Sequence, residues 1–211
     1  PVVAGFTATA TAEVQQDIVQ RLGLQNPLRE ITGFDRPNLY FDVQQPKNKL
    51  AVLVSLVQKR QGQSGIVYCA TRKSVEKVCT ALCAQGVGAT CYHAGLPDEE
   101  RQRSKDDFQF DRKTVMVATN AFGMGIDKSN VSFVIHYNMP KSLEAYYQEA
   151  GRAGRDGQPA DCILLYAPGD IATARFFIEN GGGEELSDEE QQAVRARDYA
   201  RLNVMAGYCK T

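Results

Sequence analysis

The sequence predicts an open α/β fold, in which a parallel sheet carries helices on both faces. Two observations support this class. Short apolar runs rich in β-branched residues alternate with segments long enough to be helices, which is the pattern of repeated βαβ units. Several of the longer segments repeat their apolar residues at helical spacing and end at a glycine.

The elements can be placed in chain order. The predicted strands are residues 2–6, 66–70, 89–92, 115–118, 133–137 and 162–166. One helix carries Val14, Ile18, Val19 and Leu22 on one face before Gly23, and another carries Val75, Val78, Cys79, Leu82 and Cys83 before Gly86. A later helix begins near Ser142. The last begins at Ser187, because Ser187 and Glu190 have the spacing of a capping box.

Two glycine-containing stretches mark boundaries. Residues 32–38 separate an N-terminal strand and helix from the main α/β unit, and residues 181–183 separate that unit from the last helix. The chain begins at Pro1 without a methionine, and an apolar run follows at once. We therefore expect a piece of a longer protein, with both ends loosely packed or docked in non-native ways.

The composition narrows the class of protein. The chain has 211 residues, of which 43% are hydrophobic and 23% charged, as in an ordinary globular protein. No run approaches the roughly 18 to 20 apolar residues that a membrane span needs, so we expect a cytoplasmic protein. The six cysteines lie in regular apolar segments, which favours free thiols over disulfides. The net charge of −1 does not by itself indicate a nucleic-acid-binding protein.

Three predicted strands are followed by small or polar residues. These are Thr71 and Arg72, then His93, Ala94 and Gly95, then Thr119 and Asn120. Carboxyl ends of parallel strands share one edge of the sheet, and that edge is where such folds bind ligands. Hydroxyls, an imidazole, a guanidinium and loop N–H groups aligned there would suit a row of phosphates. Taken singly, Thr71 and Thr119 fit helix caps better.

The densest signal is QEAGRAGRDG at residues 148–157. If the preceding helix continues this far, Gln148, Arg152 and Arg155 share one helical face. Each internal glycine would destabilise that helix by about 1 kcal/mol relative to alanine, which makes sense where something approaches the backbone closely. The alternative is a solvated basic surface near a fraying helix end.

Other patterns are weaker. Residues 123–129 end like a phosphate-binding loop, but Asp127 stands in place of the glycine before Lys128, and no glycine stands five residues earlier. Cys69 follows a strand like a thiolate nucleophile, yet no arginine stands six residues later, so a structural cysteine is favoured. His136 lies within an apolar strand and is expected to be a hydrogen-bonded core residue. Two histidines are too few for a histidine-based metal cluster.

At this point a family resemblance is evident. Residues 6–10, 117–127 and 148–157 resemble motifs III, V and VI of superfamily 2 helicases. FDRPNL at 34–39, SGIVYC at 64–69 and YHAGL at 92–96 resemble the interlobe join, motif IV and a further typical segment of RecQ helicases. The resemblance extends to about residue 170. It implies a RecA-like lobe without a P-loop of its own, the second motor lobe of an ATP-dependent DNA helicase.

The resemblance also implies domains and roles. Residues 1–33 would be a remnant of the first lobe, 34–38 the join, 39–180 the second lobe, and 181–211 a linker and helix leading into a zinc module. Arg152 and Arg155 would act on ATP bound by the first lobe. Gln148 and Asp127 would help bind nucleotide or couple the lobes, Gly125 would help bind nucleotide, and Thr7 and Thr9 would couple the lobes. Thr71, Arg72, His93, Thr119 and Asn120 would follow a single DNA strand, moved 3′ to 5′.

The departures from the family limit what this chain should do alone. No Walker A sequence and no Asp-Glu-x-His box occur, so ATP and Mg²⁺ belong to the full-length protein, which we expect to work in DNA repair and recombination. Cys209 would be the first ligand of a Zn²⁺ site whose other ligands are absent. We expect an inactive monomer without bound cofactors, whose partners are single-stranded and partly duplex DNA, nucleoid-associated if bacterial. The alternatives are a non-enzymatic binding module for nucleic acid or protein, and an RNA helicase lobe, which the join at 34–38 disfavours.

Overall fold

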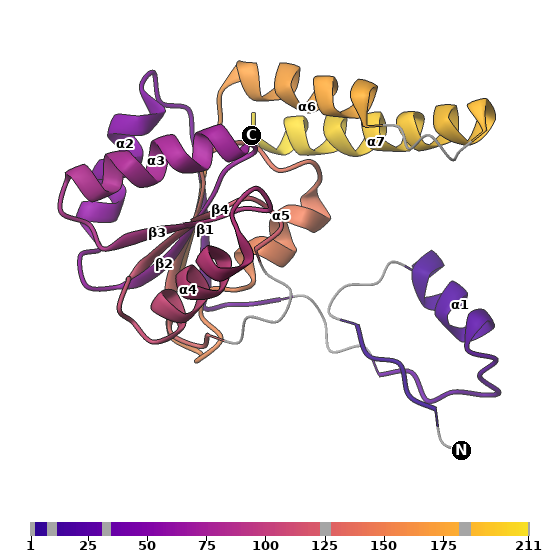
Figure 1. The fold of residues 1–211 in the computed structure, drawn as a ribbon. Coiled ribbons are helices and arrows are strands. Elements are labelled where there is room, and N and C mark those ends of the chain that lie inside the picture. The colour runs from indigo at the N-terminus through magenta and orange to yellow at the C-terminus, as the bar shows by residue number, and fades with distance from the viewer. Residues whose placement is uncertain (1–2, 8–11, 31–34, 123–127, 182–186, 211) are drawn as a thin grey trace. The chain divides into compact units, whose positions relative to one another are not determined.

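The computed structural model describes residues 3–7, 12–30, 35–122, 128–181 and 187–210 (Figure 1). The chain divides into two compact units, Pro1–Pro37 and Asn38–Thr211. The first unit carries one helix, α1 (Ala12–Arg21), in its described part. This is the helix that the apolar spacing predicts, and Gly23 follows it with φ of 61°, in the left-handed region that favours glycine.

The strand predicted at residues 2–6 is wrong for the described part of that run. Residues 3–6 join no sheet, and the side chain of Phe6 is 96% exposed. A strand is stabilised by hydrogen bonds to a neighbouring strand, and the described residues of the first unit contain none. An apolar run without a partner therefore stays irregular.

The second unit is built on a six-stranded sheet in the order β1-β6-β5-β2-β4-β3. The strands are β1 (Leu39–Gln44), β2 (Ser64–Tyr68), β3 (Ala89–Tyr92), β4 (Val115–Ala118), β5 (Val131–His136) and β6 (Ala160–Leu165). All neighbouring strands are parallel, so the predicted fold class is confirmed. The predicted strands in this unit are displaced by at most two residues, and β1 was not predicted.

Helices cover both faces of the sheet (Figure 1). On one face, α2 (Lys49–Gln58) and α3 (Arg72–Ala84) bury apolar residues such as Leu53 and Val75 against the central strands. On the other face, α4 (Asp98–Gln109) and α5 (Leu143–Ala150) contribute Phe108 and Ala150 to a second cluster. Burial on both faces explains why β4 is a continuous apolar run and why every residue of β2 is buried.

The last two helices, α6 (Pro168–Asn180) and α7 (Asp188–Tyr208), lie side by side (Figure 1). The predicted capping box begins α7: Ser187 N donates to Glu190 Oε2 over 2.9 Å, and Glu190 N donates back to Ser187 Oγ over 3.3 Å. Leu202, Met205 and Cys209 are buried in a third apolar cluster with residues of α5 and β6. Loose packing is therefore wrong for these three residues, and the alternative of non-native docking stays a prediction.

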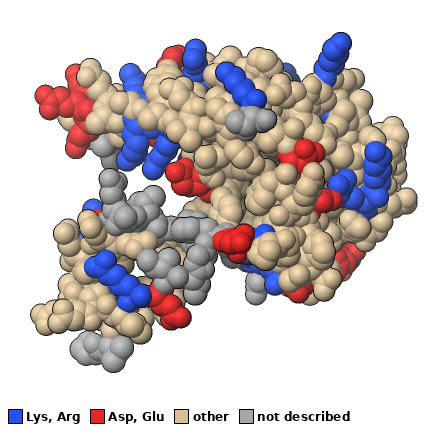
Figure 2. Space-filling view, turned by 180° about the vertical axis from the view of Figure 1, so that it is seen from behind, with Lys and Arg blue, Asp and Glu red and all other residues tan. Residues whose placement is uncertain are grey.

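Charged side chains of both signs are mixed on one face of the molecule. On the face shown in Figure 2, lysines and arginines are interspersed with aspartates and glutamates, and neither sign forms a continuous area. This distribution agrees with the net charge of −1. None of the helices in the described ranges is long and apolar enough to cross a membrane.

Candidate functional site

The three polar segments predicted at one edge of the sheet do follow adjacent parallel strands. Strand β4 lies between β2 and β3, and Tyr68 and Tyr92 are both in register with Ala118. Since these residues end their strands, the segments beginning at residues 70, 93 and 119 all leave the sheet at its carboxyl edge. Their role in binding DNA stays a prediction.

Thr71 caps the helix that follows it. Its Oγ1 accepts a hydrogen bond from Ser74 N over 3.1 Å and contacts Ser74 Oγ at 2.9 Å, so the cap interpretation is confirmed for this residue. Arg72, the first residue of α3, is exposed. A Cβ placed at Gly95 would lie 3.0 Å from Arg72 Cδ and 3.1 Å from its Nη1. Gly95 therefore leaves room for the guanidinium to lie across the neighbouring loop.

His93 shapes its loop from inside, because only 3% of its surface is exposed. Its Nδ1 accepts a hydrogen bond from Gly95 N over 3.2 Å, which places the proton of the neutral ring on Nε2. Nε2 lies 3.4 Å from Glu76 Oε1, close enough for an ion pair if the ring is protonated but outside hydrogen-bond geometry. The imidazole is thus held by its own loop and α3, and little of it is accessible to a DNA strand.

The third segment forms a tight turn after β4. Thr119 N donates to Tyr92 O over 3.2 Å, and Phe122 N donates to Thr119 O over 3.0 Å. Thr119 is half-buried in this turn and Asn120 is exposed. Gly125 and Asp127, predicted to bind nucleotide, follow the turn but lie outside the described residues, as does Thr9 of the first unit. Thr7 is exposed and belongs to no helix or strand.

The arginines of the 148–157 segment do not lie on a helix. Helix α5 ends at Ala150, so that of the three residues predicted to share a face, Gln148 alone belongs to it, exposed on its last turn. Gly154 has φ of 60° and donates its N–H to Val131 O over 2.9 Å, which no helix could accommodate. The predicted common helical face of Gln148, Arg152 and Arg155 is therefore wrong. The two arginines occupy a turn.

That turn lies at the opposite edge of the sheet from Thr71. Val131, whose carbonyl accepts from Gly154, is the first residue of β5 and so marks the amino edge. Ser142 follows the carboxyl end of β5 and caps α5, which returns from there along the face of the sheet. The two predicted sets of functional residues are thus placed at the two edges of one sheet.

Tyr68 lies between these two sets of residues. Burial raises the pKa of its phenol well above the ordinary value, and the nearby guanidinium of Arg152 opposes that shift. The Tyr68 hydroxyl also donates to Phe122 O over 3.1 Å, which attaches it to the turn after β4. The half-buried Arg152 side chain accordingly lies beside the Tyr68 phenol, whereas Arg155 is exposed.

A buried pair fixes α5 to β5. His136 Nε2 lies 2.9 Å from Glu149 Oε2, and 1% of His136 is exposed. The imidazole stacks on Tyr68 with ring centroids 5.3 Å apart and meets the edge of Tyr146 at 4.9 Å. The predicted hydrogen-bonded core role of His136 is confirmed. Its partner Glu149 was not singled out from the sequence, because an exposed-looking glutamate beside arginines gives no sign of burial.

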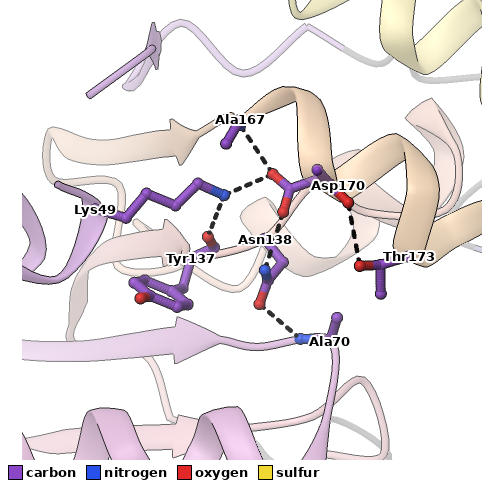
Figure 3. A network of polar contacts seen from close by, with 8 residues as sticks. Lys49, Ala70, Tyr137, Asn138, Ala167, Asp170 and Thr173 are labelled. Carbon is purple, nitrogen blue, oxygen red and sulfur yellow. Dashed lines mark hydrogen bonds and ion pairs between the residues drawn. The ribbon is translucent and has the colours of Figure 1, made fainter. Parts of the chain in front are cut away.

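A polar network lies beside the carboxyl edge of the sheet, and no sequence pattern indicated it (Figure 3). Lys49 Nζ lies 2.6 Å from Asp170 Oδ2 and donates to Tyr137 O over 3.0 Å. Asn138 Nδ2 donates to Asp170 Oδ1 over 3.0 Å, and Asn138 Oδ1 accepts from Ala70 N over 3.1 Å. The network therefore holds the backbone next to Thr71 in place.

A cavity of about 470 Å³ adjoins this network at the carboxyl ends of β2 and β5. Residues of α5, α6 and α7 form its other walls. Asn120, one of the predicted DNA contacts, lines it together with Asn138, Glu149 and Arg201. The cavity thus opens beside the predicted track.

The cysteines of interest are buried thiols. Burial raises the pKa of Cys69 to about 12 and that of Cys209 to about 11, so both are protonated at neutral pH. This confirms the structural reading of Cys69. Cys209 packs among Met139, Tyr166 and Met205, and no group of three or more His, Cys, Asp or Glu side chains in the described ranges could hold a metal ion. The described residues therefore do not fit a zinc site, and a zinc role for Cys209 stays a prediction.

Residues 48–157 match the family described as helicase conserved C-terminal domain. The chain belongs to this helicase family. Its expected RecQ character is confirmed by two bacterial relatives. It is 45% identical over 211 residues, 100% of this chain and 34% of that protein, to "ATP-dependent DNA helicase RecQ" of Bacillus subtilis. It is 47% identical over 201 residues, 95% of this chain and 32% of that protein, to the protein of the same name from Haemophilus influenzae.

The helicase C-terminal domain described here spans about a third of the length of these relatives. Among solved structures, S. cerevisiae Dbp5 bound to RNA and ADP BeF3 is similar to it with a TM-score of 0.64 and 25% identity, covering 90% of this chain and 54% of that one. The C-terminal domain of the DEAD-box protein Dbp5 is similar with a TM-score of 0.53 and 27% identity, covering 75% and 96%. Both likenesses agree with the RecA-like sheet.

Proposed function

We propose that this chain is the second motor lobe of an ATP-dependent DNA helicase of RecQ type. The observation that carries the proposal is the separation of two residue sets on one parallel sheet. The turn with Arg152 and Arg155 lies at the amino edge, and the segments after β2, β3 and β4 lie at the carboxyl edge. One lobe can then face a nucleotide and a DNA strand at the same time.

At the amino edge, Arg152 and Arg155 are the catalytic residues. Their planar, permanently charged forks suit the charge that develops on a γ-phosphate during hydrolysis, where one arginine can be worth on the order of 10³ to 10⁵ in rate. Gln148, Gly125 and Asp127 contribute to the same nucleotide site. ATP and Mg²⁺ are bound by a first lobe with a P-loop, to which Thr7 and Thr9 couple the lobe described here.

At the carboxyl edge, exposed donors follow the backbone of a single strand. Arg72 and Asn120 are exposed and can reach phosphates directly. The half-buried Thr71 and Thr119 lie along the same path, where Thr71 caps α3 and Thr119 shapes the turn after β4, and His93 maintains the shape of the middle loop. Closure and reopening of two such lobes would step the strand, 3′ to 5′ as the family resemblance implies.

The finer attributes of the protein follow from the same proposal. Alone, the chain is a monomer without ATPase activity, because the arginines need a nucleotide held elsewhere. The full-length protein binds single-stranded and partly duplex DNA and acts in the cytoplasm in repair and recombination. It supplies the remaining ligands of a Zn²⁺ site to which Cys209 contributes.

The decisive experiment is DNA-stimulated ATP hydrolysis by the full-length protein that carries this lobe. We expect an active wild type, a silent but folded Arg155→Ala variant and a silent isolated chain 1–211. Arg103→Ala removes an exposed arginine of α4 and should keep the wild-type rate. A wild type whose ATPase ignores DNA would instead favour the binding-module interpretation, and an active Arg155→Ala variant would refute the arginine's role.

A further inference from the structure

Asn38 clamps the turn that carries Arg155. Its Nδ2 donates to Gly154 O and to Gln158 O, each over 2.9 Å. Its own carbonyl accepts from Ala160 N over 2.9 Å, just where β6 begins. One side-chain amide therefore ties together both ends of residues 154–158, and both of its N–H groups are used.

The turn is shaped to receive this amide. Gly154 has φ of 60°, and a Cβ there would lie 2.4 Å from Asn38 Nδ2 and 2.9 Å from Gln158 O. Gly157 N donates to Gly154 O over 3.1 Å, and Gln158 N donates to Asp156 Oδ1 over 3.0 Å. Glycine is thus required at 154 for two reasons, its backbone conformation and the approach of Asn38.

Val131 and Asn38 contact the turn from distant parts of the chain. Residues 155–159 are exposed, so no buried apolar side chain anchors them. Gly154 N is bonded to Val131 O, which fixes the start of the turn. The hydrogen bond from Asn38 to Gln158 O fixes its far end, next to the bond from Ala160 N to Asn38 O.

We propose that Asn38 is a positioning residue for Arg155, an inference that rests on the proposed role of Arg155 in ATP hydrolysis. It acts by donating two hydrogen bonds, not by filling space. Asparagine is suited to this because aspartate, although of the same shape, would direct an oxygen at two carbonyl oxygens. Misplacement of a catalytic group by about 1 Å can lower a rate on the order of a hundredfold.

The competing interpretation is a purely structural one, in which Asn38 only secures the junction of β1 and β6. Two variants of the full-length protein separate the two. Asn38→Ala removes the donor and leaves space, whereas Asn38→Asp keeps the shape and opposes both carbonyls. We expect kcat for DNA-stimulated ATP hydrolysis to fall about tenfold in Asn38→Ala and further in Asn38→Asp. The KM for ATP and the nucleotide-free affinity for single-stranded DNA should change less than about twofold.

A matched control corrects for lost stability. Asn48 caps α2 by accepting from Ala51 N over 3.1 Å, so Asn48→Ala also removes one asparagine's contact with a backbone, away from the arginine turn. It should lower the melting temperature but leave kcat per folded molecule unchanged. If Asn38→Asp matches the wild type in kcat, or if Asn48→Ala lowers kcat equally, the proposal is overturned.

A second measurement tests whether Asn38 acts through the arginine. Arg155→Lys keeps a charge, and we expect it to keep a measurable rate. In that background Asn38→Ala should lower kcat much less than in the wild type, because effects of residues that act as a unit are not additive. If Asn38→Ala lowers kcat by the same factor in the Arg155→Lys background as in the wild type, Asn38 acts independently of Arg155 and the proposal fails. An inactive wild type or an unimpaired Arg155→Lys variant would instead show that the proposed function itself is wrong.

Discussion

Replacing Asp170 by alanine should be among the most destabilising single changes in the carboxyl-edge network. The Asp170 side chain accepts three hydrogen bonds, from Lys49, Asn138 and Ala167 N. The side chains of Lys49 and Asp170 are only 12% and 6% exposed. Without the carboxylate, the ammonium of Lys49 stays buried with Tyr137 O as its remaining hydrogen-bond acceptor.

The expected magnitude follows from that uncompensated charge. Breaking a buried ion pair from one side destabilises a protein by about 3 to 5 kcal/mol. Lys49→Met should destabilise less, because Asp170 keeps the donors of Asn138 and Ala167. The double variant should be more stable than the sum of the two single changes predicts, since it leaves no buried ammonium.

Urea unfolding of chain 1–211, followed by circular dichroism, measures these differences. The matched control is Asp107→Ala, which breaks a pair with Arg112 whose side chain is 56% exposed. That change should cost about 1 kcal/mol or less. If Asp170→Ala proves no more destabilising than Asp107→Ala, the buried network does not hold this edge together and the reasoning is wrong.

Three further predictions concern a close-packed glycine, the carboxylate beside His136 and the buried thiols. Gly65→Ala places a Cβ 2.1 Å from ring atoms of Phe133, so it should lower the free energy of unfolding by about 3 kcal/mol or more in the same urea assay, whereas Gly207→Ala, with open space around it, should not. Glu149→Ala removes the carboxylate beside buried His136 and should cost about 1 to 3 kcal/mol; an unchanged melting temperature would contradict this. In thiol labelling of the folded chain at pH 8, we expect Cys83 and Cys91 to react first. Cys83 is exposed, and the pKa of Cys91 is lowered to about 7 by a hydrogen bond from Cys79. Cys69, with a pKa raised to about 12 by burial, stays protonated at that pH and should react only on unfolding, so early alkylation of Cys69 would refute its assignment.

The sequence was informative where structure is decided locally. Gly86 ends α3 with φ of 76°, and Ser187 with Glu190 begins α7, because caps and left-handed turns depend on a few neighbouring residues. Buried strands such as β4 were readable as apolar runs. In contrast, β1 carries Asp42 and Gln44 at the edge of the sheet, and its neighbour β6 lies more than a hundred residues further along the chain.

The site was predicted less well, for the same reason. The end of α5 depends on Val131 and on Asn38, which bond to Gly154 from distant parts of the chain. Without them, a helix through Arg155 was a reasonable extrapolation from residues 142–150. Likewise, Lys49 and Asp170 are 121 positions apart, and neither stands in a recognisable motif. Side chains that act through tertiary partners leave no local pattern to read.

The pairing of Asn38 with Gly154 has a consequence for recombination between related helicases. Asn38 is the first residue of the second compact unit, one position after Pro37. A chimaera that joins two parents between residues 37 and 38 inherits the asparagine and the glycine from the same parent. A crossover placed only a few residues later, within β1, divides them. Natural exchange and laboratory shuffling should therefore tolerate the first junction and reject the second wherever the parents differ at either position.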